Sequence, residues 1–369
     1  MGLSQGTELR EKIVGTHESL RELEVFRFEQ PFWLPYRLFL KLAERKSEHA
    51  LVPALRKSDP AMLARLQGIA EGAGLPLGSL CLMNAMEAFI SSMQGRTTVP
   101  LPGACSALAV RGARSRDGEP IIAKNFDYLP LVQPFFVLRE SRPVNGLRSL
   151  DFTVAPLAGT VDGMNEKGLA ITLNYAFATD RGEPNPLITM VIEETLASCA
   201  TVAEAVKQIT RRPRWGAGML MLADASGDIA SVELSNTCAG IRRPNAGIDW
   251  LSFTNVCLCP ETCAVQVSES VVFSDNVPAA MRGKPVLQWH VNRARRIEQL
   301  VQSQSSLGPD ELAAIMADHG PKGVPDGASP CVHTDYWRTT ASLQWYPARR
   351  RARVSYSTAC KARYVEVGL

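Results

Sequence analysis

Residues 103–110 read GACSALAV, in which Cys105 stands among small residues at the start of an apolar, strand-like segment. The segment before it, QGRTTVPLPGA (94–104), is polar and contains glycine and proline, which predicts an exposed loop that is easily cut. A cysteine in an apolar strand is most often inert packing. In a second interpretation Cys105 is a nucleophile uncovered by cleavage of the bond before it, because Gly103 and Ala104 are small and leave the thiol access to a carbonyl.

Such a cleavage would leave a nucleophile and its base in one residue. The thiol of Cys105 attacks the carbonyl carbon of Ala104, the acyl group moves from nitrogen to sulfur, and water hydrolyses the thioester. The α-amino group set free on Cys105 has a reference pKa of about 7.7–8.0, far below that of a lysine. It can therefore take the thiol proton near neutral pH and activate the sulfur.

The sequence on either side of this stretch differs in character. Apolar residues at helical spacing predict helices over 60–74 and 80–93, within a mostly helical first hundred residues. After Cys105, short segments of small, β-branched and aromatic residues alternate with DG, NG and KG pairs, which predicts antiparallel strands. Later helices are expected over 186–200, 201–212, 285–303 and 308–320, and later strands over 218–224, 228–235, 250–255, 339–347 and 351–357. This order indicates the α+β class with stacked antiparallel sheets.

The composition indicates which partners and which cellular compartment to expect. The 369 residues include 40 basic and 37 acidic side chains, and the basic ones form no dominant stripe, so no nucleic-acid partner is expected. No uncharged apolar stretch is long enough for a membrane span, and the first residues lack the apolar core of a secretory signal. The nine cysteines are odd in number and scattered, which predicts a reducing compartment and a cytoplasmic location.

Sequence blocks on both sides of Cys105 carry a resemblance to a known family. They are LQGIAEGAGLP (66–76), CLMNAMEAF (81–89), GACSALAV (103–110), DGEPIIAKNFDY (117–128), DGMNEKGLAITLNYA (162–176), SFTNVC (252–257), MADHG (316–320) and TTASLQWYPARRRARVSYS (339–357). In this order they resemble the acyl-coenzyme A:6-aminopenicillanic acid acyltransferase (isopenicillin N acyltransferase)-like family. Its members are N-terminal-nucleophile cysteine hydrolases, related to choloylglycine hydrolases and acid ceramidase.

The resemblance implies a fold and a processing event. The fold is a four-layer αββα sandwich with a helical N-terminal segment. Cleavage between Ala104 and Cys105 would give a helical α-chain or propeptide (1–104) that stays bound to a catalytic β-chain (105–369). Relatives usually have glycine before the nucleophile, so alanine at position 104 is a departure that restricts the backbone.

The resemblance also gives roles to polar residues of the later blocks. Asp127 matches the aspartate that orients the new α-amino group, and Asn255 matches the asparagine whose side-chain N–H stabilises the oxyanion. Asn174 matches a second polar position of choloylglycine hydrolases, and Tyr175 next to it is a candidate for substrate binding. From the residues alone, Asp127 is equally a turn cap after a strand, and Asn255 a turn residue at a strand end.

Two basic residues are candidates for binding a substrate carboxylate. Lys124 stands where choloylglycine hydrolases carry arginine, and it either meets the substrate or faces solvent. Relatives tend to have an arginine shortly before the last hairpin, but Val332 occupies that place here. Arg338 is the nearest replacement, and this departure bears on substrate recognition more than on the nucleophile.

No metal site is expected. The segment CLCPETC (257–263) offers three thiols, and His290, His319 and His333 stand elsewhere, but zinc ribbons use C-x₂-C pairs. His319 is either a structural histidine at a helix end or a papain-like partner of Cys105. The amine of Cys105 makes such a partner unnecessary.

Together these patterns predict a self-cleaving enzyme with a cysteine nucleophile. It would take an acyl group from an amide or a coenzyme A thioester, hold it as a thioester on Cys105, and pass it to water or an amine. No bound cofactor is expected, because coenzyme A would enter only as part of the acyl donor. The alternatives are a plain amidase of the choloylglycine hydrolase type and a non-catalytic binding protein that retains the fold.

Overall fold

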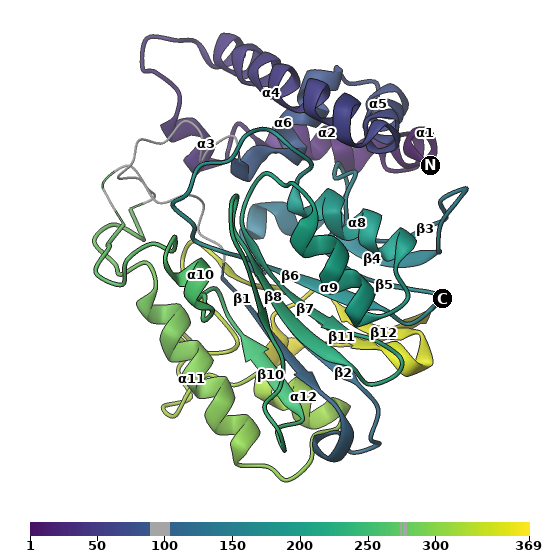
Figure 1. The fold of residues 1–369 in the computed structure, drawn as a ribbon. Coiled ribbons are helices and arrows are strands. Elements are labelled where there is room, and N and C mark those ends of the chain that lie inside the picture. The colour runs from purple at the N-terminus through teal and green to yellow at the C-terminus, as the bar shows by residue number, and fades with distance from the viewer. Residues whose placement is uncertain (89–103, 274, 276–278) are drawn as a thin grey trace.

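The computed structural model describes residues 1–88, 104–273, 275 and 279–369 and contains two antiparallel sheets between layers of helices (Figure 1). The predicted cleavable loop, apart from Ala104, and the end of the helix predicted over 80–93 lie outside the described residues. Ala104 itself is buried in a strand.

The N-terminal segment is helical, as predicted. Its helices are α1 (Gly2–Glu8), α2 (Arg10–Ser19), α3 (Glu24–Phe28), α4 (Tyr36–Ser58), α5 (Pro60–Ala73) and α6 (Leu77–Asn84). Helix α5 is capped at both ends: the Asp59 side chain accepts a hydrogen bond from Met62 N (3.0 Å), and Gly74 closes the helix with φ at 70°. Helices α1 and α5 pack so closely that a Cβ on Gly6 would lie 2.4 Å from the Ile69 carbonyl oxygen.

The first sheet contains the strand that begins at Ala104. Its strands lie in the order β10 (Trp250–Phe253), β1 (Ala104–Val110), β2 (Ile121–Tyr128), β11 (Arg338–Tyr346), β12 (Arg351–Ser355) and β13 (Val365–Gly368). All the pairings are antiparallel. The central position of β1 and β2 places both in the interior, so almost every residue of these strands is buried.

The second sheet is formed by the middle of the chain. Its strands lie in the order β3 (Phe136–Ser141), β4 (Ser149–Val154), β5 (Asp162–Asn165), β6 (Ala170–Tyr175), β7 (Gly218–Ala223), β8 (Ile229–Leu234) and β9 (Ala239–Arg242). Each strand pairs with the next along the chain, and the connection from β6 to β7 contains two helices.

Four layers result from how these elements bury their apolar faces. Phe126 of the first sheet meets Phe136 and Phe152 of the second edge to face, within one core between the sheets. Helices α8 (Ile188–Ser198) and α9 (Val202–Arg211) cover the other face of the second sheet. Helices α11 (Gln288–Gln302) and α12 (Pro309–Met316) cover the other face of the first. The fold is therefore the expected αββα sandwich.

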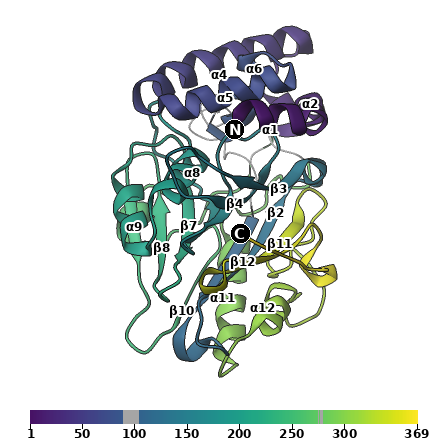
Figure 2. The ribbon, with the colours of Figure 1, turned by 90° about the vertical axis from the view of Figure 1, so that its right-hand side faces the viewer.

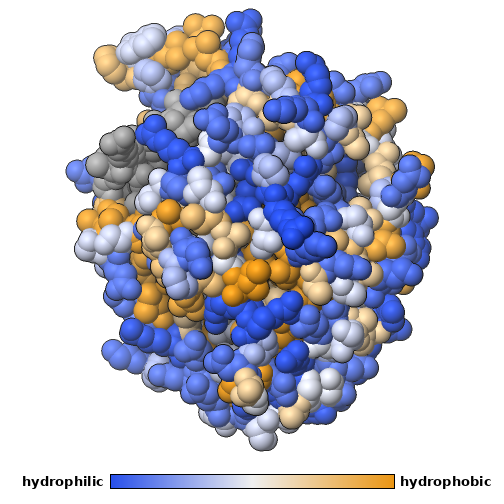
Figure 3. Space-filling view, in the orientation of Figure 1, coloured by the Kyte–Doolittle hydropathy of each residue, from blue (hydrophilic) through white to orange (hydrophobic). Residues whose placement is uncertain are grey.

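The N-terminal helices gather at one end of this sandwich, as Figures 1 and 2 both show. The remaining short helix, α10 (Pro260–Cys263), follows β10. Over the described part of the chain, no helix combines the length and the apolar character that a bilayer crossing requires. Figure 3 shows a projecting hydrophobic corner where α4 begins, and its exposed side chains are Phe32, Trp33, Leu38 and Leu42.

Candidate active site

The pairing of β1 with β2 brings Cys105 and Asp127 to one place. In this register Ala104 lies opposite Asp127, and Cys105 lies opposite Phe126. The Cys105 sulfur is 3.9 Å from the Asp127 carbonyl oxygen, and its side chain is almost fully buried at the wall of a cavity. The pairing of these two strands thus makes the candidate nucleophile and the candidate orienting carboxylate neighbours.

Asn255 holds the backbone nitrogen of Cys105. Its Oδ1 accepts hydrogen bonds from Cys105 N (2.9 Å) and from Arg293 Nη2 (3.0 Å). Its Nδ2 donates to the Tyr175 carbonyl oxygen (2.8 Å). Because two donors meet Oδ1 and an acceptor meets Nδ2, the orientation of the amide is determined by its partners.

Asp127 is the carboxylate of this network. Its Oδ1 accepts a 2.5 Å hydrogen bond from Thr339 Oγ1, and Arg293 Nη1 lies 3.8 Å from its Oδ2. Burial raises the pKa of Asp127 to about 6, although the Arg293 guanidinium and the Thr339 hydroxyl act to lower it. Among the described residues, Oδ2 has no hydrogen-bond partner. One oxygen is thus fixed and the other is free to accept a further donor.

Arg293 joins the two candidates from the outer helical layer. It lies on α11, is fully buried, and contacts both Asp127 and Asn255. Its Nη2 also meets His290 Nδ1 at 2.7 Å. Burial and the nearby guanidinium lower the pKa of His290 well below its ordinary value, so this histidine is neutral and can accept the bond. Arg293 Nη1 also donates to the Gly327 carbonyl oxygen (3.3 Å), so the centre contains a buried cation matched to a carboxylate and three neutral acceptors.

Asn174 supports the strand end that carries Asn255. Its Nδ2 donates to the Thr254 carbonyl oxygen at 2.6 Å, so it holds the residue before Asn255. Its Oδ1 is buried without a hydrogen-bond partner among the described residues. The contact that the structure gives Asn174 is with the backbone beside the site.

Lys124 is fully buried, which excludes the predicted solvent-facing alternative. Its Nζ lies 3.4 Å from Asp162 Oδ1 and donates to the Leu173 carbonyl oxygen. Burial raises the pKa of the Cys105 thiol to about 12, and the Lys124 charge acts against that rise while Asp127 adds to it. Lys124 is thus paired with protein groups and acts on Cys105 through its charge.

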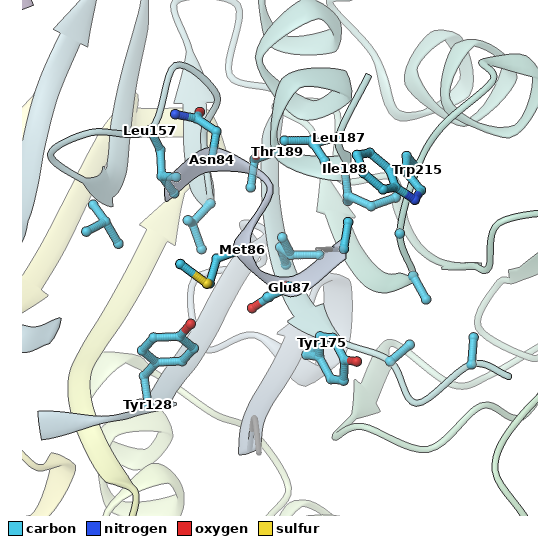
Figure 4. Close-up of a pocket in the computed structure, with 18 of the residues that line it drawn as sticks. Asn84, Met86, Glu87, Tyr128, Leu157, Tyr175, Leu187, Ile188, Thr189 and Trp215 are labelled. Atoms are coloured by element: carbon cyan, nitrogen blue, oxygen red, sulfur yellow. The ribbon is translucent and has the colours of Figure 1, made fainter. Parts of the chain in front are cut away.

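A cavity of about 1000 Å³ opens at Cys105. Its walls combine α2 and the region after α6 with residues of both sheets and of the loops around α8. In Figure 4, Met86 and Glu87 of the N-terminal segment lie beside Tyr128 and Tyr175, which come from the two sheets. Most of the lining is apolar, as in sites that bind small molecules.

Glu87 is the acidic group of this cavity nearest to the N-terminal helices. Its side chain lines the cavity and is exposed there. Burial raises the pKa of Glu87 to about 7. A carboxylate that titrates near neutrality therefore faces the same space as Cys105.

The other candidate residues lie in different places. Tyr175 lines the cavity, as a substrate-binding residue would. Arg338 is exposed at the start of β11 and is not among the described residues that line the cavity, which does not favour the predicted contact with substrate. His319 packs edge to face on the His333 ring, with centroids 5.2 Å apart, so its ring has a neighbour other than Cys105.

The cysteines of CLCPETC form hydrogen bonds that hold this segment in its turn. Glu233 accepts hydrogen bonds from Leu258 N and Cys259 N at 2.9 and 3.0 Å, and from Thr262 Oγ1. Cys263 Sγ donates to the Cys257 carbonyl oxygen at 3.2 Å. The segment is thereby folded around one carboxylate.

A family model for acyl-coenzyme A:6-aminopenicillanic acid acyl-transferase matches residues 114–306. This range covers more than half of the chain and includes Asp127, Asn174, Asn255 and Arg293, and it begins after Cys105. The chain belongs to this acyl-transferase family.

The sequence matches no curated protein, and several solved structures are similar to this one. An N-acylethanolamine-hydrolyzing acid amidase ortholog of Caenorhabditis elegans is 13% identical, with a TM-score of 0.46, covering 72% of this chain and 100% of that one. A mutant conjugated bile acid hydrolase of Clostridium perfringens is 15% identical, with a TM-score of 0.47, covering 72% and 92%. Penicillin V acylase of Agrobacterium tumefaciens is 20% identical, with a TM-score of 0.46, covering 72% and 86%.

Membership of the acyl-transferase family supports an enzyme that transfers acyl groups. The sequence analysis missed Arg293, the residue of this centre that touches both Asp127 and Asn255. A signal was available: His290, Arg293, Ile297 and Val301 are the buried positions of α11, so a charge stands on the inward face of an amphipathic helix. Such a charge is rarely buried unless it is paired.

Proposed function

We propose that this member of the acyl-transferase family is a self-cleaving N-terminal-nucleophile enzyme that carries its acyl group as a thioester on Cys105. The observation that supports this most directly is the hydrogen bond between Cys105 N and Asn255 Oδ1, within a network that ends on Asp127. An inert packing cysteine needs no such arrangement around its backbone nitrogen. A nucleophile whose own α-amino group is the base requires one.

In the proposed cleavage, the Cys105 sulfur forms a bond to the carbonyl carbon of Ala104 and the bond from that carbon to Cys105 N breaks. The thiol proton moves to the departing nitrogen, which becomes the α-amino group. Water then adds to the thioester, so that Ala104 ends in a carboxylate and the thiol is restored. The pairing of Ala104 with Asp127 across β1 and β2 supports this step, because it keeps the carboxylate beside the bond that breaks.

In the proposed turnover, the free α-amino group accepts the thiol proton as sulfur attacks the acyl donor. Asp127 Oδ2, which lacks a hydrogen-bond partner among the described residues, would accept from the resulting ammonium. The second Nδ2–H of Asn255 would donate to the oxyanion, since the first is used by the Tyr175 carbonyl. The ammonium returns its proton to the leaving amine or thiol, and water or an amine then takes the acyl group.

The two chains would remain together because the N-terminal helices are bound firmly to the rest of the molecule. Gln5 Nε2 donates to the carbonyl oxygens of Ala155 (2.9 Å) and Leu157 (3.0 Å), and Arg65 pairs with Glu193. Asn84 donates to the Pro156 carbonyl oxygen and accepts from Ala158 N, both at 2.9 Å. The same helices supply one wall of the cavity, so the proposed α-chain would also help to bind substrate.

The cavity supports an acyl donor with an apolar acyl part. Leu20, Leu23, Met83, Leu157 and Val161 line it together with Cys105. An amide or a coenzyme A thioester would place its carbonyl carbon at the sulfur and its acyl chain among these side chains. Coenzyme A would then be part of a substrate and not a bound cofactor.

The test is intact-mass analysis of purified protein, alone and after incubation with a panel of acyl amides and acyl thioesters. Wild type should give chains that end at Ala104 and begin at Cys105, with an acyl adduct on the second chain. Cys105→Ala should remain one chain and gain no adduct, and the matched control Cys263→Ser should behave as wild type. Cleavage of Cys105→Ala at the same bond, or an adduct on the first chain, would overturn the proposal.

A further inference from the structure

Four side chains with metal-binding atoms meet outside the cavity described above. They are His319, Cys331, His333 and Cys360, and one ligand atom from each lies within 4.8 Å of all the others. His319 follows α12, Cys331 and His333 precede β11, and Cys360 lies on the short helix η4 (Ala359–Lys361). Three separate segments of the chain thus bring two thiols and two imidazoles together.

The spacing of these atoms fits a tetrahedral ion. His333 Nε2 lies 3.3 Å from Cys331 Sγ and 3.5 Å from Cys360 Sγ. Zinc–sulfur and zinc–nitrogen bonds of about 2.3 and 2.0–2.1 Å at tetrahedral angles place neighbouring ligand atoms about 3.3–3.8 Å apart. The longest separations in the cluster exceed this range by about 1 Å, which a small side-chain rotation covers.

The hydrogen bonds described within the cluster join both thiols to His333 Nε2. Among the described residues, His319 Nε2 is buried without a hydrogen-bond partner. The rings of His319 and His333 pack edge to face, at an interplanar angle of 86°. A buried nitrogen without a donor or acceptor is costly, and a cation that takes its lone pair removes that cost.

We propose that His319, Cys331, His333 and Cys360 form a structural zinc site of the Cys₂His₂ type. Two thiolates and two imidazoles are the donor set that selects zinc, and four protein ligands leave no open position for a substrate. On binding, the two thiols lose their protons to solvent and the sulfurs and ring nitrogens each donate one electron pair. The ion would be neutralised by the two thiolates, so the site carries no net charge.

The scaffold around the four ligands is rigid, as a structural site requires. Asp318 forms two hydrogen bonds with Arg296 of α11, at 2.8 and 2.7 Å, and its carbonyl oxygen accepts from Cys331 N at 3.1 Å. Asn125 Nδ2 donates to the carbonyl oxygens of Met316 (2.8 Å) and Pro330 (2.9 Å). The two ends of the segment that carries His319 and Cys331 are therefore held before any ion binds.

The proposed ion would fasten the C-terminal part of the chain to the catalytic layer. Val332, between two of the ligands, accepts from Thr339 N and donates to Thr339 Oγ1, both at 2.9 Å. The same hydroxyl donates to Asp127. The site would thus stabilise the segment that presents Thr339 to the carboxylate, without touching substrate.

Metal content tests the proposal on full-length protein purified without chelator and dialysed against zinc. Wild type should contain about one zinc ion per chain by elemental analysis, and removal of zinc should lower the melting temperature by several degrees. Cys360→Ser and His333→Ala should lose the bound zinc, while the controls Cys263→Ser and His49→Ala should keep it. The controls change the same residue types at exposed positions outside the cluster.

A second measurement needs no variant. Titration of metal-free wild type with cobalt(II) should give the intense visible bands of a tetrahedral ion and a thiolate charge-transfer band. Three outcomes would overturn the proposal: less than a tenth of an ion per chain after zinc dialysis, zinc that is retained in Cys360→Ser, or a Cys331–Cys360 disulfide in protein purified under reducing conditions. A cobalt spectrum without thiolate bands would overturn it as well.

Discussion

Two centres of this molecule each contain a buried cysteine, one around Cys105 and one at the His319–Cys331–His333–Cys360 cluster, and they differ in the groups that surround the sulfur. Around Cys105, donors and acceptors alternate: an amide N–H and a guanidinium meet Asn255 Oδ1, and a hydroxyl and the same guanidinium meet Asp127. In the His319–Cys331–His333–Cys360 cluster, both thiols lie within 3.5 Å of one imidazole nitrogen, and His319 Nε2 has no hydrogen-bond partner among the described residues. The first centre pairs its buried cation with protein groups and leaves Asp127 Oδ2 open, whereas the second presents the donor set for a cation from outside.

This difference teaches that residue type does not decide what a buried cysteine does. Cys105 opens on a cavity of about 1000 Å³, where its sulfur can meet a substrate. Cys331 is fully buried and is not among the described residues that line that cavity. A cysteine acts as a nucleophile or as a metal ligand according to whether substrate can reach its sulfur and which charged or polar groups surround it.

The largest effect is expected when the internal cation of the first centre is removed. Arg293→Met leaves Asp127 buried without its charge partner, which typically costs about 3–5 kcal/mol of folding free energy. Urea unfolding, measured on the uncleaved Cys105→Ala background, gives this value. Arg295→Met, an exposed position of the same helix, should cost about 0.5 kcal/mol or less. Equal losses for the two variants would show that the first centre is not held by this cation.

The next prediction distinguishes the role of the Asn255 oxygen from that of its Nδ2 donor. Asn255→Asp keeps an oxygen for Cys105 N and Arg293 Nη2 but removes the Nδ2 donor. Turnover should fall by about 10²–10³-fold, the usual loss for one oxyanion donor, while the folding free energy falls only by the cost of the lost bond to the Tyr175 carbonyl oxygen, about 1–3 kcal/mol. Steady-state kinetics and thermal melts measure the two effects side by side. Near-normal turnover of a folded Asn255→Asp enzyme would assign the oxyanion to another donor.

A smaller effect is expected at the hydroxyl that connects the two centres. Thr339→Val removes two hydrogen bonds, to Asp127 Oδ1 and from Val332 N, and a net contribution of about 0.5–1.5 kcal/mol for each gives a loss of about 1–3 kcal/mol in all. The zinc content should stay at the wild-type value, because Thr339 is not a ligand. Thr340→Val, which loses one bond to the Phe126 carbonyl oxygen, is the matched control and should affect turnover less. Loss of zinc from Thr339→Val would mean that the centres are not separable.

Much of the fold followed from local pattern. Helix α9 lies within the range predicted over 201–212, and it begins with a capping box in which the Thr201 side chain accepts from Glu204 N and the Glu204 carboxylate accepts from Thr201 N. Helix α8 begins at Ile188 and not at Pro186, since the residues before it lie in extended backbone. Periodicity and turn residues are encoded over a few positions, so they can be read from the chain directly.

The two centres are harder to predict because their residues are distant in sequence. His319 and Cys360 are 41 positions apart, and no short spacing of the C-x₂-C kind marks the cluster. The sequence analysis weighed the cysteines close together in CLCPETC and expected no metal site, and it did not consider these four residues as a group. Arg293 was missed for a related reason, since its partners Asp127 and Asn255 belong to other elements and only its inward place on α11 marks it.

The smallest expected effect is a displacement of the acidic limb of the pH–rate profile. If the α-amino group of Cys105 is the base, the rate falls as this group gains its proton, near its reference pKa of about 7.7–8.0. The Asp127 carboxylate favours the ammonium form and so raises that pKa. Asp127→Asn removes the charge, so the limb should move to lower pH even as the overall rate falls.

Two carboxyl groups complicate this limb, and variants distinguish them. The pKa of Asp127 is raised by burial to about 6, so below that pH wild type also loses the charge that orients the amine. The pKa of Glu87 is raised by burial to about 7, within the range of the amine. Glu87→Gln should leave the position of the limb unchanged, because Glu87 lines the cavity and has no place in the network around Cys105 N. If the limb instead moves in Glu87→Gln and stays in Asp127→Asn, a carboxylate of the cavity is the base. The hydrogen-bond network around Cys105 N would then not be the source of the reactivity of Cys105.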